Sequence, residues 1–552
     1  MCGIEAGKSL ETYTQLLFEE ADLHLKENEF KNLSDFSDRV DLVYNCITKL
    51  NTFKTEVAKH QDRKSNRESE MIRKQGNDLF LRQGNYLVAL EYYTKSIAYA
   101  ESGSTNLALA YANRSACLYE RRYYKQCLED IDRALSLDYP EKSKQKLLKR
   151  KASVETQKSK QKQVSYYNSP PVIKSKNPLI DCAEDSIEIQ YNKKYGRHVI
   201  ASRDIKIGEV LSAENSVCHV VHPESKYIHC HECLELCYNL IPCESCCSSL
   251  YCSEECRSKC YEGYHKYECQ FHKILLSPLM VFIKLALIGM NDLKKIEADC
   301  PDNIHLFNSF KEIIKLEMNE ENWNYINLCI PAIAASIAYY TLKENQEFTS
   351  KYDTDEDDCN IKKLLYKAYM INTFFPFNIK KIRYTPNYIE SKRVGTALYA
   401  FTSFYNHSCV PNCEFFYYGS LIVTRAQAPI KKGEQVTISY GSYFYRTPKA
   451  TRQEILKKTY FFNCDCKACT HNWPTIMDLP IGKDLSLWFI LKVSQNIFDG
   501  TESNQKLQDE LLTESKRLYY ELEEDQPCQN LLRVQHMITE IYAYQASRDV
   551  EF

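Results

Sequence analysis

The sequence lacks an excess of either charge, a secretory signal and a long apolar run. It has 71 basic and 73 acidic side chains among 552 residues, so no whole-chain field attracts it to nucleic acid or to an anionic membrane. Residues Met1 to Lys8 do not place an apolar run behind a basic end, as a secretory signal does. The longest weakly polar run, Asn327 to Leu342, contains Pro331 and is shorter than the roughly 20 residues that cross a bilayer. We therefore expect a soluble, intracellular protein without membrane association. The lysines of residues 157–178, together with Lys149, Arg150 and Lys151, offer a nuclear-import patch, so the expected compartments are the cytoplasm and the nucleus.

Disulfides are not expected either, because they do not persist in a reducing compartment. The chain nevertheless has 25 cysteines, and many of them crowd into two stretches, Cys230 to Cys269 and Cys464 to Cys469. Metal sites require such clustering, whereas scattered core cysteines do not show it. The chain is also too long for one hydrophobic core, and its length predicts about three or four domains.

Helical periodicity dominates the N-terminal part. Residues 1–68 predict a helical segment without recognisable chemistry. Over residues 69–156, apolar residues recur at helical spacing in two units about 34 residues apart, with small residues such as Gly76 alternating with aromatic ones such as Tyr86. This pattern resembles an array of tetratricopeptide repeats. Residues 157–179 are rich in Lys, Ser, Gln and Pro and predict a solvated linker.

Eight residues of the first cysteine-rich stretch have the spacing of a two-metal finger. They form four pairs: Cys230-x2-Cys233, Cys243-x2-Cys246, Cys252-x3-Cys256 and His265-x3-Cys269. Zinc prefers four thiolate or imidazole ligands in a tetrahedron, and a CxxC pair places two thiolates on one ion from one turn. The eight ligands therefore predict two closed, structural sites. Because Cys247 directly follows Cys246, the sequence leaves open which of these two is the ligand.

Three further motifs stand in a fixed order around this finger. Tyr195-Gly196-Arg197 lies upstream in a strand pair, Asn406-His407-Ser408-Cys409 follows downstream, and an alternating strand then ends at Tyr440. This order resembles the SET domain of methyltransferases. A SET domain interrupted by a MYND finger resembles the SMYD family, and the repeats point to its repeat-bearing branch. The resemblance implies a protein-lysine N-methyltransferase that uses S-adenosylmethionine.

The resemblance also implies the organisation of the fold. We expect an α+β multidomain protein with helical repeats, a β-rich SET domain split by a MYND zinc finger and a helical insertion, a post-SET zinc site and C-terminal helices. The expected ranges after the linker are 180–229 for the first part of the SET domain, 230–269 for the finger, 270–371 for the helical insertion, 372–445 for the SET core, 446–472 for the post-SET segment and 473–552 for the C-terminal helices.

The same resemblance assigns residues to the cofactor pocket and to the metals. The implied contacts to S-adenosylmethionine are Gly196, Arg197, Asn372, Ser403, Asn406, His407, Tyr440 and Phe462, with Phe462 stacking on adenine. Alternate pairs of the finger would share an ion, which gives Cys230, Cys233, Cys252 and Cys256 for one zinc and Cys243, Cys246, His265 and Cys269 for the other. The run Cys464-x-Cys466-x2-Cys469 supplies only three ligands. The resemblance adds Cys409 as the fourth ligand of a third zinc.

The chemistry of methyl transfer gives roles to two tyrosines. The reaction is an in-line displacement, so the enzyme aligns a sulfonium methyl group with a neutral lysine amine. Burial in an aromatic channel lowers the pKa of that amine, because desolvation disfavours its charged form. Tyr440 is the predicted catalytic hydroxyl, and Tyr460 is the predicted second aromatic residue of the channel. The continuation Gly441 to Phe444 departs from the apolar-acidic continuation of better-studied relatives, so the channel width and the degree of methylation stay open.

The repeats carry a predicted peptide site. Arg73, Asn77, Asn113, Lys146 and Arg150 fall at positions where chaperone-binding repeats grip a C-terminal carboxylate. Cations and amides that face one groove favour an acidic peptide end, so chaperone tails are predicted partners. The same asparagines also occur in repeats that only stack on one another.

Two rival functions remain at the level of sequence. A catalytically weak or inactive scaffold would recruit chaperones and nuclear partners through its repeats and its MYND finger, which would dock peptides. Retention of Asn406, His407 and Tyr440 favours the enzyme, which would act on a histone or a non-histone protein. Direct DNA binding by the finger is disfavoured, because its many glutamates repel phosphate.

Overall fold

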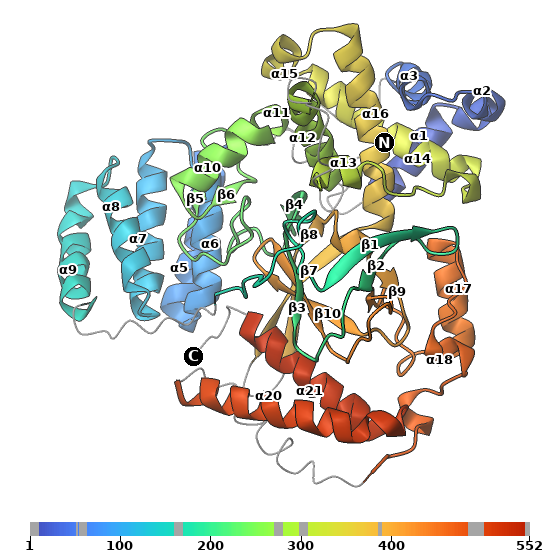
Figure 1. Cartoon of the computed structure of the whole chain (residues 1–552). Coiled ribbons are helices and arrows are strands. Elements are labelled where there is room, and N and C mark those ends of the chain that lie inside the picture. Colours follow the sequence, from blue (N-terminus) through green and yellow to red (C-terminus); the bar gives the residue numbers. More distant parts are fainter. Residues whose placement is uncertain are drawn as a thin grey trace.

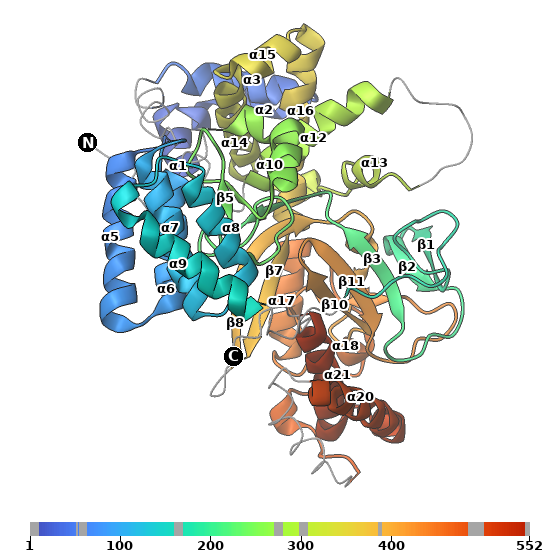
Figure 2. The ribbon, with the colours of Figure 1, turned by 90° about the vertical axis from the view of Figure 1, so that its left-hand side faces the viewer.

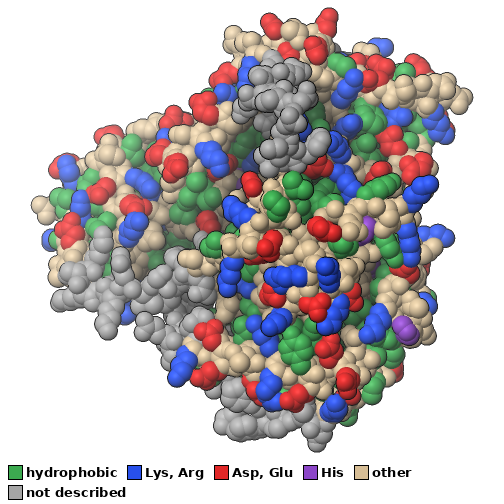
Figure 3. Space-filling view, in the orientation of Figure 1, with side chains coloured by type: hydrophobic (Ala, Val, Ile, Leu, Met, Phe, Trp, Pro, Cys, Tyr) green, Lys and Arg blue, Asp and Glu red, His purple; other side chains and the backbone are tan. Residues whose placement is uncertain are grey.

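Most strands lie between groups of helices in Figure 1, and one strand pair forms the right-hand edge of the molecule in Figure 2. The computed structural model describes residues 10–50, 53, 63–158, 169–269, 280–296, 307–384, 389–483 and 502–546. Its combination of helical N-terminal parts, several small sheets and C-terminal helices confirms the expected α+β multidomain class. Basic and acidic side chains are intermixed over the face shown in Figure 3, as the balanced composition predicts.

The N-terminal helices pack against helices from the middle of the chain. The N-terminal helices are α1 (Leu10–Glu20), α2 (Glu27–Lys31) and α3 (Phe36–Ile47). The helices of the insertion are α12 (Met280–Ile296), α13 (Ser309–Ile313), α14 (Tyr325–Lys343), α15 (Gln346–Lys351) and α16 (Asp355–Phe374). Helix α1 contacts α14, and α3 contacts both α14 and α16 (Figure 1). Sequence patterns within residues 1–68 do not indicate these partners, which lie far along the chain.

Helix α14 is the most apolar of these elements. It is the one helix of the described ranges that is long and apolar enough to cross a membrane by length and composition alone. The run Asn327 to Leu342, which was expected to be too short to cross a bilayer, lies within this helix of 19 residues. In the structure, 78% of its most apolar window is buried. Its apolar character therefore fits its position between α1, α3 and α16.

Five helices form a consecutive array over the predicted repeat region. They are α5 (Asn66–Gln83), α6 (Tyr86–Tyr99), α7 (Thr105–Glu120), α8 (Tyr124–Leu135) and α9 (Glu141–Lys158), and each contacts the next. A Cβ atom at Gly76 would lie 2.7 Å from the ring of Tyr93, so the close approach of α5 and α6 requires glycine there. The identification of this array with tetratricopeptide repeats stays a prediction. Residues 159–168 of the predicted linker lie outside the described ranges.

The central strands form several small sheets. Two sheets have three strands: β10 (Cys413–Tyr418), β11 (Leu421–Ala426) and β3 (Val210–Asn215) form one, and β4 (Cys218–Val221), β8 (Ile389–Leu398) and β7 (Phe377–Tyr384) form the other. The two-stranded sheets are β1 (Ile187–Asn192) with β2 (Gly196–Ala201), β5 (Ile241–Pro242) with β6 (Leu250–Tyr251), and β9 (Asn406–His407) with β12 (Thr437–Ile438). The β9–β12 pair is parallel, which brings the Asn-His motif beside the strand that leads to Tyr440.

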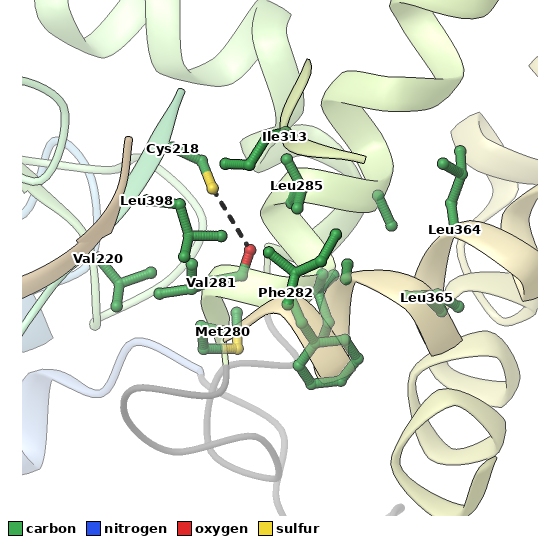
Figure 4. Close-up of a cluster of buried hydrophobic side chains, with 14 of the residues drawn as sticks. Cys218, Val220, Met280, Val281, Phe282, Leu285, Ile313, Leu364, Leu365 and Leu398 are labelled. Atoms are coloured by element: carbon green, nitrogen blue, oxygen red, sulfur yellow. Dashed lines mark hydrogen bonds between the residues drawn. The ribbon is translucent and has the colours of Figure 1, made fainter. Parts of the chain in front are cut away.

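Buried side chains connect the insertion to these strands. Val281 and Phe282 of α12 lie beside Cys218 of β4 and Leu398 of β8 (Figure 4). The Cys218 thiol donates a hydrogen bond to the carbonyl oxygen of Val281 at 3.7 Å. The insertion is therefore part of the same core as the central sheets.

The C-terminal helices cover another side of the strands. After α17 (Lys449–Tyr460) and α18 (Lys467–Thr470), the chain forms α20 (Glu502–Leu522) and α21 (Gln529–Ala546). Helix α21 packs on β10, and buried side chains of both helices, including Leu511 and Ile538, form one apolar cluster with Phe416. At the C-terminal end of α21, the ammonium group of Lys381 donates to the carbonyl oxygen of Ala546 at 3.2 Å. A cation at this end of a helix is favourable because the last carbonyl groups point at it.

Candidate active site

One cavity of about 720 Å³ collects residues from distant parts of the chain. This volume is typical of sites for small organic ligands. The predicted cofactor and channel residues that line it are Gly196, Arg197, Ser403, Asn406, His407, Tyr440, Tyr460 and Phe462. Asn372 is the exception, because it is buried near the end of α16 and is not among the lining residues. Phe374, two positions later, lines the cavity instead.

Gly196 begins strand β2 at the turn of the β1–β2 hairpin. Its φ of 62° lies in the left-handed region that glycine adopts without strain. The Asn192 side chain closes the turn by accepting from the backbone N–H groups of Lys194 and Tyr195 at 3.0 and 2.9 Å. The carbonyl oxygen of Tyr195 accepts from the side-chain amide of Asn406 at 3.3 Å. The hairpin is thus held directly against the Asn-His motif.

His407 connects three parts of the site. Its Nδ1 accepts from the backbone N–H of Tyr440 at 3.0 Å, so its proton resides on Nε2. That Nε2 lies 3.3 Å from the sulfur of Cys409. Burial lowers the pKa of His407 to about 4, which keeps the ring neutral. The imidazole therefore fixes the position of the Tyr440 backbone relative to the cysteine.

Tyr440 and Tyr460 form an aromatic pair at the cavity wall. Their ring centroids are 4.9 Å apart and the ring planes are inclined by 50°. The Tyr440 hydroxyl donates to the carbonyl oxygen of Tyr405 at 2.9 Å. Burial raises the pKa of both hydroxyls above the ordinary value, so both stay protonated near neutral pH. The pair can present neutral hydroxyl groups and ring faces to a bound ligand.

Arg197 lines the cavity, but its guanidinium group is directed at the insertion. It forms an ion pair with Glu312 at 2.6 Å and donates to the carbonyl oxygen of Lys315 at 2.9 Å. It also lies 4.6 Å from the ring centroid of Phe404. The sequence-based expectation was a cofactor contact in the Gly196-Arg197 turn, and both residues line the cavity, while the Arg197 guanidinium group also holds α13 and the residues that follow it.

The two predicted metal groups of the finger come together as expected. Cys230, Cys233, Cys252 and Cys256 form one group, and Cys243, Cys246, His265 and Cys269 form the other. In each group all ligand atoms lie within 4.8 Å of one another. A tetrahedron of sulfurs about 2.3 Å from zinc has sulfurs about 3.8 Å apart. The observed separations of 3.7 Å for Cys233–Cys252 and 3.8 Å for Cys243–Cys269 fit that geometry.

The finger also settles the choice that the sequence left open. Cys246, not Cys247, lies in the second group, where its sulfur is 3.5 Å from Nε2 of His265. On the other side of this ring, Nδ1 of His265 lies 3.3 Å from a carboxylate oxygen of Glu268. A carboxylate behind a ligating histidine holds the ring orientation that metal binding needs.

A third group joins the Asn-His-Ser-Cys motif to the post-SET segment. Cys409, Cys464, Cys466 and Cys469 place their sulfurs within 4.8 Å of one another, with Cys409 at 3.9 Å from Cys464 and 3.6 Å from Cys469. Because four thiolates leave a divalent ion with net negative charge, a nearby cation is favourable. The fully buried Arg452 supplies one, with Nη2 at 3.6 Å from the sulfur of Cys469. The same arginine donates to the carbonyl oxygens of Phe444 and Thr447 at 3.4 and 2.5 Å.

Several cavity residues had no signal that single-sequence reasoning could use. Leu316, Glu317 and Asn319 come from the insertion, and Tyr519 and Glu523 come from the C-terminal helices. Their segments reach the cavity only through packing between elements that are distant in sequence. A signal did exist for Phe374, because this aromatic residue stands two positions after Asn372, which the resemblance assigned to the cofactor pocket.

Three of the five predicted peptide residues, Asn77, Asn113 and Arg150, meet around α7. The Asn77 side-chain oxygen accepts from the amide of Asn113 at 2.8 Å and from the Tyr93 hydroxyl at 2.9 Å. Arg150 of α9 donates to the carbonyl oxygen of Ala112 at 2.9 Å. Lys146 is exposed and Arg73 is half-buried. Part of this predicted clamp therefore also fastens neighbouring helices together.

The array of helices and the finger are joined by a buried polar network. Arg114 is fully buried and forms a two-point ion pair with Asp130, while its third nitrogen donates to the carbonyl oxygen of Leu240 at 2.9 Å. Arg133 donates to the carbonyl oxygen of Asn239 at 2.9 Å. These contacts lie next to β5, directly before the metal-group residue Cys243.

Comparisons with known proteins give a consistent result. The SET domain model matches residues 196–441. The chain is 23% identical over 547 residues to the protein-lysine N-methyltransferase SMYD4 of Danio rerio, covering 81% of this chain and 71% of that protein. It is 24% identical over 538 residues to SMYD4 of Homo sapiens, covering 72% and 66%. A SET and MYND domain-containing protein of Dictyostelium discoideum is 28% identical over 324 residues, covering 52% and 82%.

Proposed function

Because the chain belongs to the SMYD family of SET and MYND methyltransferases, we propose that it transfers a methyl group from S-adenosylmethionine to a lysine side chain of a protein substrate. The observation that carries this proposal is the single cavity in which the Gly196 hairpin, the Asn406-His407 motif and the Tyr440–Tyr460 pair meet. Methyl transfer to lysine needs a pocket for the methyl donor that leads directly to an aromatic channel for the amine. The Gly196 hairpin and the Asn406-His407 motif suit the pocket, and the Tyr440–Tyr460 pair suits the channel.

Binding of the cofactor would rest on hydrogen-bonding and aromatic groups. Asn406 and the Gly196 turn line the part of the cavity next to the hairpin, and Phe462 provides an aromatic face near His407, with ring centroids 6.1 Å apart. Glu317 adds a carboxylate that is favourable beside a cationic ligand. S-adenosylmethionine, when bound, supplies a methyl group on an electrophilic sulfonium sulfur.

The tyrosine pair would prepare the lysine amine. Ring faces that exclude water lower the amine pKa, because the charged form loses its hydration. The neutral hydroxyl of Tyr440 is anchored on the Tyr405 carbonyl group, and its remaining lone pairs are free to accept from an N–H group of the amine. Tyr460 narrows the channel beside it. Alignment of amine and methyl group supplies most of the rate advantage in such a displacement.

Zinc is the metal that best suits the three groups. Thiolate and imidazole donors in closed groups of four match the preference of structural zinc sites. Two ions would shape the finger. The third would tie Cys409, adjacent to the Asn-His motif, to the segment after α17, so metal binding would complete the cofactor cavity.

Two variants test the enzymatic proposal in the full-length, zinc-loaded protein. Asn406→Ala should abolish detectable cofactor binding by calorimetry. Tyr440→Phe should retain it but lower methyl transfer to protein substrates about 100-fold, the order of loss when one preorganised hydrogen-bonding group is removed from an active site. Tyr443→Phe is the matched control, since its hydroxyl donates to Glu414 and does not line the cavity. A wild-type protein that is folded and metal-loaded but binds no cofactor would favour the scaffold function.

A second proposed role belongs to the repeats, which we expect to bind acidic peptide ends such as chaperone tails. The support is the convergence of Asn77, Asn113 and Arg150 around α7, with exposed Lys146 on the same helix as Arg150. Exchanging Lys146 and Arg150 for alanine should abolish binding of an acidic tail peptide. Unchanged affinity would contradict the clamp. Such partners, and peptide docking by the finger, fit a protein that works in the cytoplasm and the nucleus.

A further inference from the structure

The N-terminal helices are integrated into the core beside the cavity. Leu17, Leu23, Phe30, Val40 and Val43 are almost completely buried. Polar contacts reinforce the packing against α14: the Tyr325 hydroxyl donates to the carbonyl oxygen of Leu23 at 2.6 Å, and the Ser336 hydroxyl donates to that of Val40 at 3.2 Å. Figures 1 and 2 both show these helices beside α14 and α16. This segment, which had no recognisable chemistry in the sequence, belongs structurally to the catalytic part.

The helices α1, α2 and α3 are called the N-terminal lobe below. Arg39 of α3 connects this lobe to the residues that line the cavity. Its Nη1 lies 3.1 and 3.2 Å from the two carboxylate oxygens of Glu320, and its Nε donates to the carbonyl oxygen of Leu33 at 3.0 Å. The Arg39 side chain is only 12% exposed and that of Glu320 is 26% exposed. Such a partly dry ion pair is held more firmly than a pair on the surface.

Glu320 begins a short 3₁₀ helix, η3 (Glu320–Asn322), directly after the cavity wall. The preceding residue, Asn319, lines the cavity with a φ of 50°. A residue other than glycine stays in this left-handed region only when its surroundings hold it there. Leu316 and Glu317 line the cavity in the same segment.

This wall segment is held at both ends by arginine. Arg197 of the cofactor hairpin binds Glu312 and the carbonyl oxygen of Lys315 on one side. Arg39 binds Glu320 on the other side. Between the two anchors lie the cavity residues 316, 317 and 319.

The same lobe supports a second wall. Phe36, next to Arg39 on α3, stacks on Tyr366 of α16 with ring centroids 4.8 Å apart and planes inclined by 12°. Helix α16 carries Phe374, which lines the cavity and lies 5.3 Å from the Trp323 ring just after η3. The N-terminal lobe therefore contacts the supports of both insertion segments that face the ligand.

From these contacts we infer that Arg39 is a positioning residue of the methyl-donor site, and that the N-terminal helices complete its wall. The inference rests on the proposed function for the nature of the ligand. Arg39 does not touch the ligand. It fixes Glu320 and so maintains the conformation of residues 316–319.

The test uses the full-length, metal-loaded protein and two measurements. Arg39→Ala should accelerate amide hydrogen exchange at Asn322 and Trp323, whose N–H groups donate to the carbonyl oxygens of Asn319 and Glu320, both at 3.0 Å. It should also raise the dissociation constant for S-adenosylmethionine roughly tenfold. The KM for the donor should rise, whereas kcat, measured at saturating donor, should change less, because the variant leaves the Tyr440–Tyr460 pair untouched. A uniform loss of structure would not produce that split.

Matched variants separate positioning from general stability. Lys363→Gln removes the 2.7 Å ion pair with Asp35, which also joins the N-terminal lobe to α16 but does not involve η3. It should leave both measurements unchanged. Glu320→Gln should reproduce the effect of Arg39→Ala, and the double variant should add nothing further.

The results distinguish the two proposals. Equal exchange and equal donor affinity in Arg39→Ala and wild type would overturn the positioning role. Equal effects of Lys363→Gln and Arg39→Ala would overturn it too, because they would indicate only the stability of the lobe. If the folded wild type binds no donor, the proposed function fails, and the exchange of residues 316–323 alone decides whether Arg39 holds the wall.

Discussion

At the scale of single residues, the Tyr440 hydroxyl is defined by its protonation state. Its oxygen donates to the Tyr405 carbonyl group, which requires the neutral phenol. Burial raises its pKa above the ordinary value of about 10, so the neutral form persists well beyond physiological pH. The hydrogen bond would be lost only as pH rises through this elevated pKa.

This protonation state predicts the pH dependence of catalysis. The rate at low substrate concentration should increase from about pH 6.5 toward pH 9.5 as substrate lysine (ordinary pKa about 10.4) loses its proton. It should show no descending limb from Tyr440 in that range. The measurement is kcat/KM against pH for wild type and Tyr440→Phe. If kcat/KM of the wild type instead decreased with rising pH before pH 9, and this decrease disappeared in Tyr440→Phe, the assignment would be contradicted.

Arg452 has a different task at the third metal group. Replacing it with methionine would leave a buried thiolate cluster without its neighbouring cation and two carbonyl groups without their donor. We expect a destabilisation of about 3–5 kcal/mol, as when one partner of a buried ion pair is removed. One metal equivalent should also be lost faster to a chelator. Thermal unfolding and metal release measure the two effects, with exposed Arg446→Met as the control. Identical release of all three metals would argue against this role.

At the scale of elements, the buried Arg114 network couples the stability of the helical array to that of the finger. Arg114→Met should leave Asp130 buried without its two-point partner and release the carbonyl group of Leu240. Asp130 keeps its second ion pair, with Arg133 at 2.9 Å, so the expected cost is at the lower end of the range for a broken buried pair, about 3 kcal/mol, concentrated in α7, α8 and β5. Hydrogen exchange should report faster opening of these three elements, and Lys125→Met on the exposed face of α8 should not change it. Loss of protection confined to α7 and α8 would contradict the coupling to the finger.

The limits of sequence-based prediction follow the range of the interactions. Ligand pairs such as Cys230-x2-Cys233 are local and could be read from spacing, and their grouping by alternate pairs agrees with the structure. The hairpin at Gly196 and the strand before Tyr440 are local too. The direction of the Arg197 guanidinium depends on Glu312, and no local pattern indicates a partner 115 positions away. The same reason hides the docking of α1 and α3 on α14.

At the scale of the whole molecule, the three metal groups differ in their connection to the cavity. Cys409→Ser should lose one metal equivalent and the cofactor affinity together, because the third group joins the Asn-His motif to the segment that carries Phe462. Cys233→Ser should lose one equivalent and retain cofactor binding. Metal analysis and calorimetry on the two variants measure this difference. Loss of cofactor binding in both would indicate that the finger also maintains the cavity.

The burial of α14 by the N-terminal helices has a consequence for synthesis on the ribosome. The apolar faces of α1 and α3 leave the ribosome long before their partner exists. At about 5–20 residues per second, the delay between Ile47 and Tyr325 is roughly 15 to 60 seconds. During that interval the array of helices and the finger can fold, while the N-terminal segment has to be shielded from aggregation. The cavity wall that these helices support can therefore be completed only after α14 has been made, although α1 and α3 are synthesised much earlier.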